Sequence, residues 1–137
     1  VMIAMFISPL SAVIVAIGTA IGFMFNSPIT IVLRALSHVV FAFAGAWFIK
    51  KKPGILNSIP KLSLLGGITA LLHAVFEFLV VLPFYFTGQT AAFYEKGFLY
   101  SMVLLLGGGT IVHSTVDFII AVLIVQVLVR ANVFSRQ

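Results

Sequence analysis

The chain has 137 residues, of which 62% are hydrophobic and only 8% are charged. A water-soluble domain carries roughly 25% charged residues, because charge is needed to cover a surface that faces water. The composition therefore excludes a soluble domain. It predicts an all-α integral membrane protein, a bundle of about four transmembrane helices that contacts the lipid bilayer.

The net charge of +5 does not indicate a nucleic-acid-binding protein. The basic residues form no basic face but stand at the ends of apolar runs, where they report membrane topology. The chain contains no cysteine, which excludes a disulfide, a thiolate zinc site and a cysteine nucleophile. Because the sequence begins with Val1 rather than methionine, we expect it to start inside a longer protein.

Four apolar runs are each long enough to cross a hydrocarbon core of roughly 30 Å. A turn at residues 26–28 (Asn-Ser-Pro) precedes the second run, and residues 50–54 (Lys-Lys-Lys-Pro-Gly) end it. Three glycines at 107–109 interrupt the apolar sequence before the fourth run. Residues 98–106 are then too short to span, and we expect an interfacial helix or a re-entrant piece there. The predicted spans form one domain and cover residues 9–25, 29–49, 62–86 and 110–129.

The positive residues predict the orientation of the bundle. The triple lysine at 50–52 and Lys61 place the connection between the second and third spans in the cytoplasm. Arg130 and Arg136 place the C-terminus there as well. The connections after the first and third spans then lie outside, so the four assignments alternate consistently.

The first span carries a ladder of small residues. Ala12, Ala16 and Ala20 recur every four residues, and Gly18 and Gly22 have the same spacing. Small residues at this spacing let two helix backbones approach closely in lipid. Two interpretations remain open: packing within this chain, or a docking surface for another membrane subunit.

Six ionisable residues stand inside the predicted spans, in three pairs spaced i, i+4: Arg34 and His38, His73 and Glu77, and His113 and Asp117. Each pair shares one helix face. An ionisable group at this depth costs at least ~2–3 kcal/mol unless it is paired or hydrated, so all six should face the bundle interior. At ~1.5 Å per residue, four of them lie roughly 5–14 Å below the outer surface. His38 and His73 lie deeper, and the six together predict a polar pocket open toward the outside.

A few convergent polar groups in an apolar cavity are typical of a small-molecule site, and this set suits a flat polar heterocycle. We predict that Glu77 or Asp117 accepts a hydrogen bond from the ligand ring and that a histidine provides a second bond. Nearby aromatic residues are candidate walls for this pocket: Phe41, Phe76, Phe84, Tyr85 and Tyr94.

Other interpretations of the same residues remain open. Arg34 can simply neutralise Glu77 or Asp117 and lock the helices, as in a membrane scaffold such as a cell-shape protein. A third interpretation is a divalent metal permease, with His73, Glu77, His113 and Asp117 as ligands, although Arg34 would repel a cation. No HExxH, GxSxG or phosphate-binding glycine loop occurs, so we predict no catalytic residue and no cofactor.

The sequence resembles the substrate-binding S components of energy-coupling factor (ECF) vitamin transporters. Ser8-Pro9-Leu10-Ser11-Ala12 opens a small-residue helix, and the turn at 26–28 follows it. The next helix ends with Phe43-Ala44-Gly45-Ala46-Trp47 before the lysines. The last helix carries Gly109-Thr110 followed by His113 and Asp117. The resemblance covers nearly all of the chain. The chain looks like the last four of the family's six helices.

The resemblance implies a substrate-capture subunit of an ATP-driven micronutrient importer in the plasma membrane of a prokaryote. S components bind a vitamin or its precursor from outside and dock on an energising transmembrane subunit, which couples to two cytoplasmic ATPase subunits. Thiamine precursors, pyridoxine-like compounds and nicotinate all fit the predicted pocket. The family's first two helices, including the one with its docking motif, have no counterpart here, so the resemblance does not assign a docking role to Ala12, Ala16 and Ala20.

Overall fold

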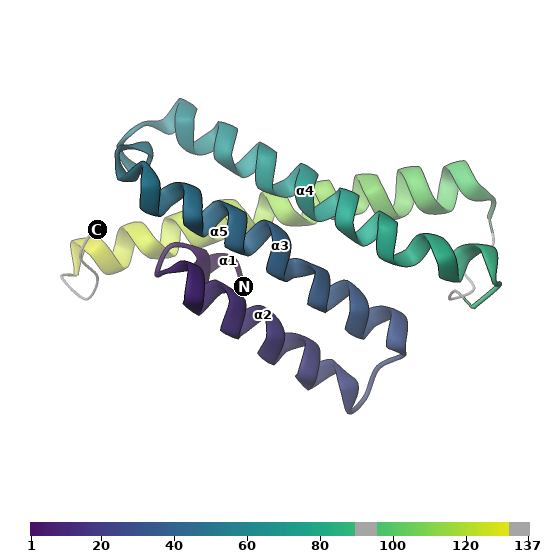
Figure 1. Ribbon diagram of the computed structural model, residues 1–137. Helices are drawn as coiled ribbons and strands as arrows, with labels where there is room; N and C mark the ends of the chain where they lie inside the picture. Colours follow the sequence, from purple (N-terminus) through teal and green to yellow (C-terminus); the bar gives the residue numbers. More distant parts are fainter. Residues whose placement is uncertain (90–95, 132–137) are drawn as a thin grey trace.

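A computed structural model of the chain describes residues 1–89 and 96–131, which form helices joined by short connections (Figure 1). Three helical segments are long and apolar enough to cross a membrane, and a fourth is shorter. This confirms the predicted helical membrane bundle. Tyr94 and Arg136 lie outside the described residues. The elements in chain order are α1 (Met2–Met5), α2 (Pro9–Met24), α3 (Ile29–Lys51), the 3-10 helix η1 (Pro53–Asn57), α4 (Ile59–Phe86), the π-helix η3 (Leu99–Gly108) and α5 (Gly109–Arg130).

Local signals explain where the first helices begin. The Ser8 side chain accepts a hydrogen bond from the Ser11 backbone N–H at 3.0 Å, and Pro9 occupies the first turn of α2. Serine satisfies an N–H that the helix itself cannot bond, and proline has no N–H to satisfy. Pro28 stands directly before α3. These breaks force the chain to reverse, so that α2 and α3 lie side by side, as Figure 1 shows.

The three alanines of the small-residue ladder are buried by packing within the chain. Ala12 and Ala16 are fully buried, and Ala20 is 4% exposed. Ala20 packs with Val32 and Ala35 of α3, because small side chains let the two backbones approach closely. These three alanines therefore have no free surface to offer another subunit. The prediction that they dock a partner is corrected in favour of packing against α3.

The three glycines at 107–109 do not interrupt the last span. η3 and α5 form one continuous helix of 32 residues, Leu99–Arg130. Gly109 has φ −59° and ψ −43°, an ordinary right-handed helical conformation. Glycine costs only about 1 kcal/mol relative to alanine in a helix, whereas each unpaired backbone group in lipid costs several. The predicted interfacial or re-entrant piece at 98–106 is therefore wrong.

The helices α4 and α5 meet at Gly66, where the Phe118 ring lies directly over the backbone. A Cβ atom on Gly66 would stand 2.7 Å from this ring, whereas one on Gly67 would meet no atom within 4 Å. We expect Gly66→Ala to lower the free energy of unfolding by about 1–3 kcal/mol, because the ring must move out of a packed position. Gly67→Ala is the matched control. Thermal unfolding in detergent measures both, and equal stability of the two variants would contradict this packing.

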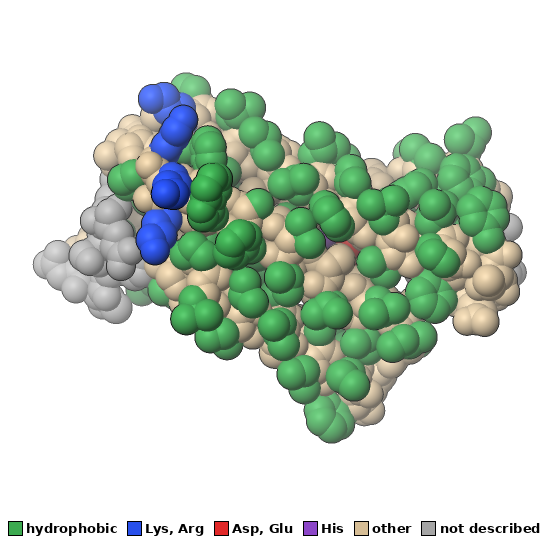
Figure 2. Space-filling model, in the orientation of Figure 1, with side chains coloured by type: hydrophobic (Ala, Val, Ile, Leu, Met, Phe, Trp, Pro, Cys, Tyr) green, Lys and Arg blue, Asp and Glu red, His purple; other side chains and the backbone are tan. Residues whose placement is uncertain are grey.

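The face of the bundle drawn in Figure 2 is mostly apolar, and its basic residues gather near one end. Figure 2 shows hydrophobic side chains over most of the visible face and Lys and Arg side chains in a band near one end. The exposed residues Lys51 and Lys52 lie over the rings of Trp47 and Phe48, at 6.0 and 5.5 Å from the ring centroids. Basic and aromatic residues of this kind mark a membrane–water interface. The end of α5 lies at this same end of the bundle (Figure 1).

Candidate functional site

The buried carboxylate of Glu77 joins three helices. Glu77 lies in α4 and is 5% exposed. Its Oε2 accepts a hydrogen bond from Arg34 Nη2 of α3 at 3.1 Å and one from Thr110 Oγ1 of α5 at 2.6 Å. A charge-assisted hydrogen bond is roughly twice as strong as a neutral one, and more so away from water. This carboxylate therefore holds α3, α4 and α5 together at one point.

Two histidines face the other oxygen of the same carboxylate. The Nε2 atoms of His38 and His73 lie 3.6 and 3.4 Å from Glu77 Oε1. His73 is buried, and its Nδ1 shares a hydrogen bond with Ser114 Oγ of α5. The rings of His38 and His73 meet edge to face with centroids 4.4 Å apart, and Phe41 packs on His73 at 4.5 Å. Both sides of Glu77 thus carry polar groups from neighbouring helices.

His113 and Asp117 lie at the edge of this cluster, not inside it. Their side chains are 61% and 44% exposed in this chain, and His113 Nε2 lies 3.4 Å from Asp117 Oδ2. The prediction that all six ionisable residues face the interior is therefore wrong for this pair. The inward face of α5 is instead built from residues three or four apart: Thr110, Ser114, Phe118, Ala121 and Val125. The helix is rotated so that His113 and Asp117 flank that face.

Two cavities flank the cluster. One has a volume of about 300 Å³ and is lined by Arg34, His38, Glu77, Thr110 and His113, with Leu105, Leu106 and Gly109 of the last helix. The other has a volume of about 400 Å³ and is lined by groups that include His38, Phe41, His73, His113 and Asp117. His38 and His113 are common to both. Small-molecule sites typically occupy about 300–1,000 Å³, so these volumes suit a small ligand.

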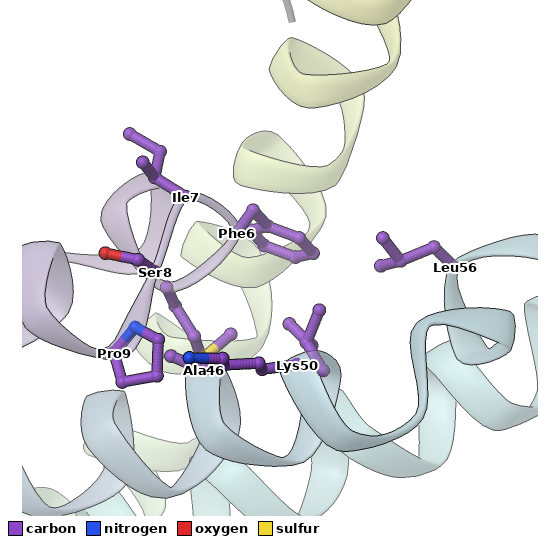
Figure 3. A pocket seen from close by; sticks show the side chains of 9 residues that line it. Phe6, Ile7, Ser8, Pro9, Ala46, Lys50 and Leu56 are labelled. Atoms are coloured by element: carbon purple, nitrogen blue, oxygen red, sulfur yellow. The ribbon is translucent and has the colours of Figure 1, made fainter. Parts of the chain in front are cut away.

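A third cavity near the lysine end differs in chemistry (Figure 3). It has a volume of about 120 Å³ and lies where α1 and the start of α2 meet the end of α3. Its walls include Phe6, Pro9, Ala46 and Leu56, and among the described residues that line it Lys50 alone is charged. It is smaller than typical small-molecule sites and lacks convergent polar groups, so the cavities beside Glu77 are the better candidates.

Two polar members of the site are absent from the predicted set, and some of the predicted aromatic walls lie elsewhere. Thr110 and Ser114 bond Glu77 and His73, and their i, i+4 spacing on the last helix was the available signal. Of the predicted aromatic walls, only Phe41 lines either of the two cavities within the described residues; Phe76, Phe84 and Tyr85 do not. Tyr85 packs instead against Phe98, with centroids 5.6 Å apart.

The structure also regroups the residues considered as metal ligands. The predicted set of two histidines and two carboxylates does not form one cluster, because Asp117 pairs with His113 at the edge and not with Glu77 among the described residues. Instead, potential ligand atoms of His38, His73 and Glu77 all lie within 4.8 Å of one another.

Comparison with known proteins gives one clear relative. The chain is 42% identical over 132 residues, 96% of its length, to the niacin transporter NiaX of Lactococcus lactis subsp. cremoris (strain MG1363). It spans 59% of the length of that protein. No family model and no solved structure match the chain. The chain is therefore similar to a vitamin transporter, in agreement with the resemblance to vitamin-transporter S components that its sequence carries.

Proposed function

We propose that this chain forms the substrate-binding part of a vitamin importer, and that its cargo is niacin or a closely related pyridine carboxylate. The observation that carries this proposal is the 42% identity to a niacin transporter over 96% of the chain. So extensive a match spans all the helices that contribute to the site. Among the three vitamin classes that fit the predicted pocket, it favours nicotinate.

The chemistry of the smaller flanking cavity supports an anionic, aromatic ligand. Niacin is a flat pyridine ring that carries one carboxylate. Arg34 lines the 300 Å³ cavity and its side chain is 24% exposed. Its planar guanidinium matches a carboxylate in shape and charge. We place the ligand carboxylate on Arg34, with Leu105 and Leu106 as apolar walls for the ring.

His113 is the proposed second directional contact. It lines the same cavity as Arg34, and Asp117 orients its ring from one turn further along α5. An imidazole nitrogen that carries a proton can donate to the pyridine nitrogen of niacin. A cation and a hydrogen-bond donor that line the same cavity would recognise a ring that carries an acid group and a basic nitrogen.

The orientation and partners belong to the same proposal. Arg34 lies sixteen residues before Lys50 in α3, which is about 24 Å along the helix axis. If the lysine band and Arg130 face the cytoplasm, as positive residues usually do, the site lies in the outer half of the bilayer and the C-terminus lies inside. This supports capture from the outside by a multi-pass protein of a prokaryotic plasma membrane. Uptake would then be driven by an energising transmembrane subunit and its two ATPase subunits.

The test is direct binding of niacin to the detergent-purified protein, measured by isothermal titration calorimetry. Nicotinamide is the matched control ligand, because it has the same ring but no negative charge for Arg34. We expect saturable one-to-one binding of niacin, at least about tenfold tighter than that of nicotinamide, since a charge-assisted pair exceeds a neutral one. Folded protein that binds neither compound, nor thiamine precursors or pyridoxine, would favour the scaffold, in which Arg34 and Glu77 only lock the helices.

A further inference from the structure

The spacing around Glu77 Oε1 is unusual for hydrogen bonds. The Nε2 atoms of His38 and His73 stand 3.6 and 3.4 Å from this oxygen. An N–H···O hydrogen bond is typically about 2.9–3.0 Å long. Two ligands that each lie about 2.0–2.1 Å from a tetrahedral metal ion are about 3.3 Å apart. The two observed N···O separations are closer to the distance between two ligand atoms of one metal ion than to the length of a hydrogen bond.

We call His38, His73 and Glu77 the triad. In Glu77 and His73, the polar atom that does not face the other members of the triad is hydrogen-bonded by residues outside it. Glu77 Oε2 accepts hydrogen bonds from Arg34 and Thr110. His73 Nδ1 shares a hydrogen bond with Ser114. Metal-binding histidines and carboxylates are usually oriented in this way through the atom that does not bind the ion. Such an arrangement leaves Glu77 Oε1 and His73 Nε2, which lie 3.4 Å apart, as the atoms available to bind an ion.

His73 Nε2 adds a separate observation. His73 is 2% exposed, and its Nε2 makes no hydrogen bond with any described residue. A buried polar atom without a hydrogen-bond partner requires an explanation, and the binding of a metal ion is one. The nearest possible ligand of the same ion from another helix is His38, whose ring meets that of His73 edge to face.

We propose that His38, His73 and Glu77 bind one divalent transition-metal ion, such as Zn²⁺, Co²⁺ or Ni²⁺. Two imidazoles and one carboxylate suit these ions. Three protein ligands leave a further coordination position open. His38 lines both cavities, His73 lines one and Glu77 the other, so the ion would lie beside the ligand site. Contact between the ion and the ligand carboxylate or pyridine nitrogen is the part of this inference that rests on the proposed function.

Arg34 sets a limit on the affinity of this site. Its guanidinium lies 3.1 Å from Oε2, the oxygen of Glu77 that does not face the histidines, and its charge repels a cation. Arg34 and Glu77 cancel, so a bound divalent ion leaves an excess of two positive charges when the histidines are neutral. An anionic ligand reduces that excess to one. Niacin and the metal are therefore expected to strengthen each other's binding, which linkage requires to be reciprocal.

The experiment titrates Co²⁺ into chelator-stripped, detergent-purified protein and follows its visible absorption, with the Zn²⁺ content measured by elemental analysis. We expect one ion per chain. His38→Gln is expected to weaken Co²⁺ binding about a hundredfold or more, because it removes a ligand rather than an outer group worth 10–100-fold. Unfolding of the metal-free variant checks that it still folds, and His38 is the suitable position because its side chain is partly exposed.

His113→Gln is the discriminating variant, because His113 contacts the same cavities but lies outside the triad. It is expected to weaken niacin binding while Co²⁺ affinity and the absorption spectrum stay as in the wild type. Absence of a stoichiometric ion, or equal loss of Co²⁺ in His113→Gln and His38→Gln, would overturn the metal site. Niacin is titrated into metal-free and loaded protein in parallel. If the protein binds niacin but no metal, the proposed function stands and the metal site is wrong. If it binds metal but no niacin, the metal site stands and the proposed function is wrong.

Discussion

Arg34→Gln is expected to weaken niacin binding about a hundredfold or more, the cost of removing one partner of a buried, hydrogen-bonded charge pair. The substitution takes away the cation that lines the 300 Å³ cavity and leaves a neutral amide of shorter reach. Arg34→Lys is expected to recover only part of the affinity, because an ammonium lacks the planar fork that matches a carboxylate. Calorimetric titration of niacin into each purified variant measures the loss.

The control for this prediction addresses the fold. Arg34→Gln also leaves the carboxylate of Glu77 without its cation, so a loss of binding can reflect a disturbed bundle. The double variant Arg34→Gln with Glu77→Gln removes both charges and restores electrical balance. It is expected to unfold at a temperature near that of the wild type and still to bind niacin weakly. If the double variant binds niacin as tightly as the wild type, Arg34 does not hold the ligand.

Glu77→Gln is expected to lower the free energy of unfolding by about 3 kcal/mol, because it breaks a largely buried ion pair from one side. Glu77 is the shared acceptor for Arg34 and Thr110, and its side chain is only 6% exposed. Glutamine keeps the shape but removes the charge that compensates Arg34. Chemical unfolding in detergent measures the effect, and the double variant described above should recover most of it.

This second prediction differs from the one that the sequence alone supports. From the sequence, Glu77 or Asp117 is predicted to accept a hydrogen bond from the ligand ring, and on that basis Glu77→Gln should lose affinity while its expression stays intact. In the structure Oε2 of Glu77 is already engaged by Arg34 and Thr110, so we expect its substitution to act through the position of Arg34 and to reduce stability too. A Glu77→Gln protein as stable as the wild type would return Glu77 to the role of a direct ligand contact.

Composition and local patterns predicted the membrane bundle and the presence of its polar site. Hydrophobicity is a property of each residue, so the tendency of an apolar run to cross lipid can be judged from that run alone. The i, i+4 pairs were also readable, because helical periodicity alone places His73 and Glu77 on one face, where they lie 3.4 Å apart. The glycines at 107–109 were misread because glycine weakens a helix in water, whereas lipid penalises an unpaired backbone far more.

Local sequence patterns do not predict which residues of different helices come into contact. From the sequence, either Glu77 or Asp117 could pair with Arg34. In the tertiary structure Arg34 pairs with Glu77. The tertiary structure also brought in Thr110 and turned His113 to the edge. The rotation of each helix about its axis makes these choices, and packing along its whole length sets that rotation, as where the Phe118 ring covers Gly66. The sequence therefore determined by itself which segments cross the membrane and which helix positions carry polar residues, and only the packed bundle decided which of these residues meet and which stay at its edge.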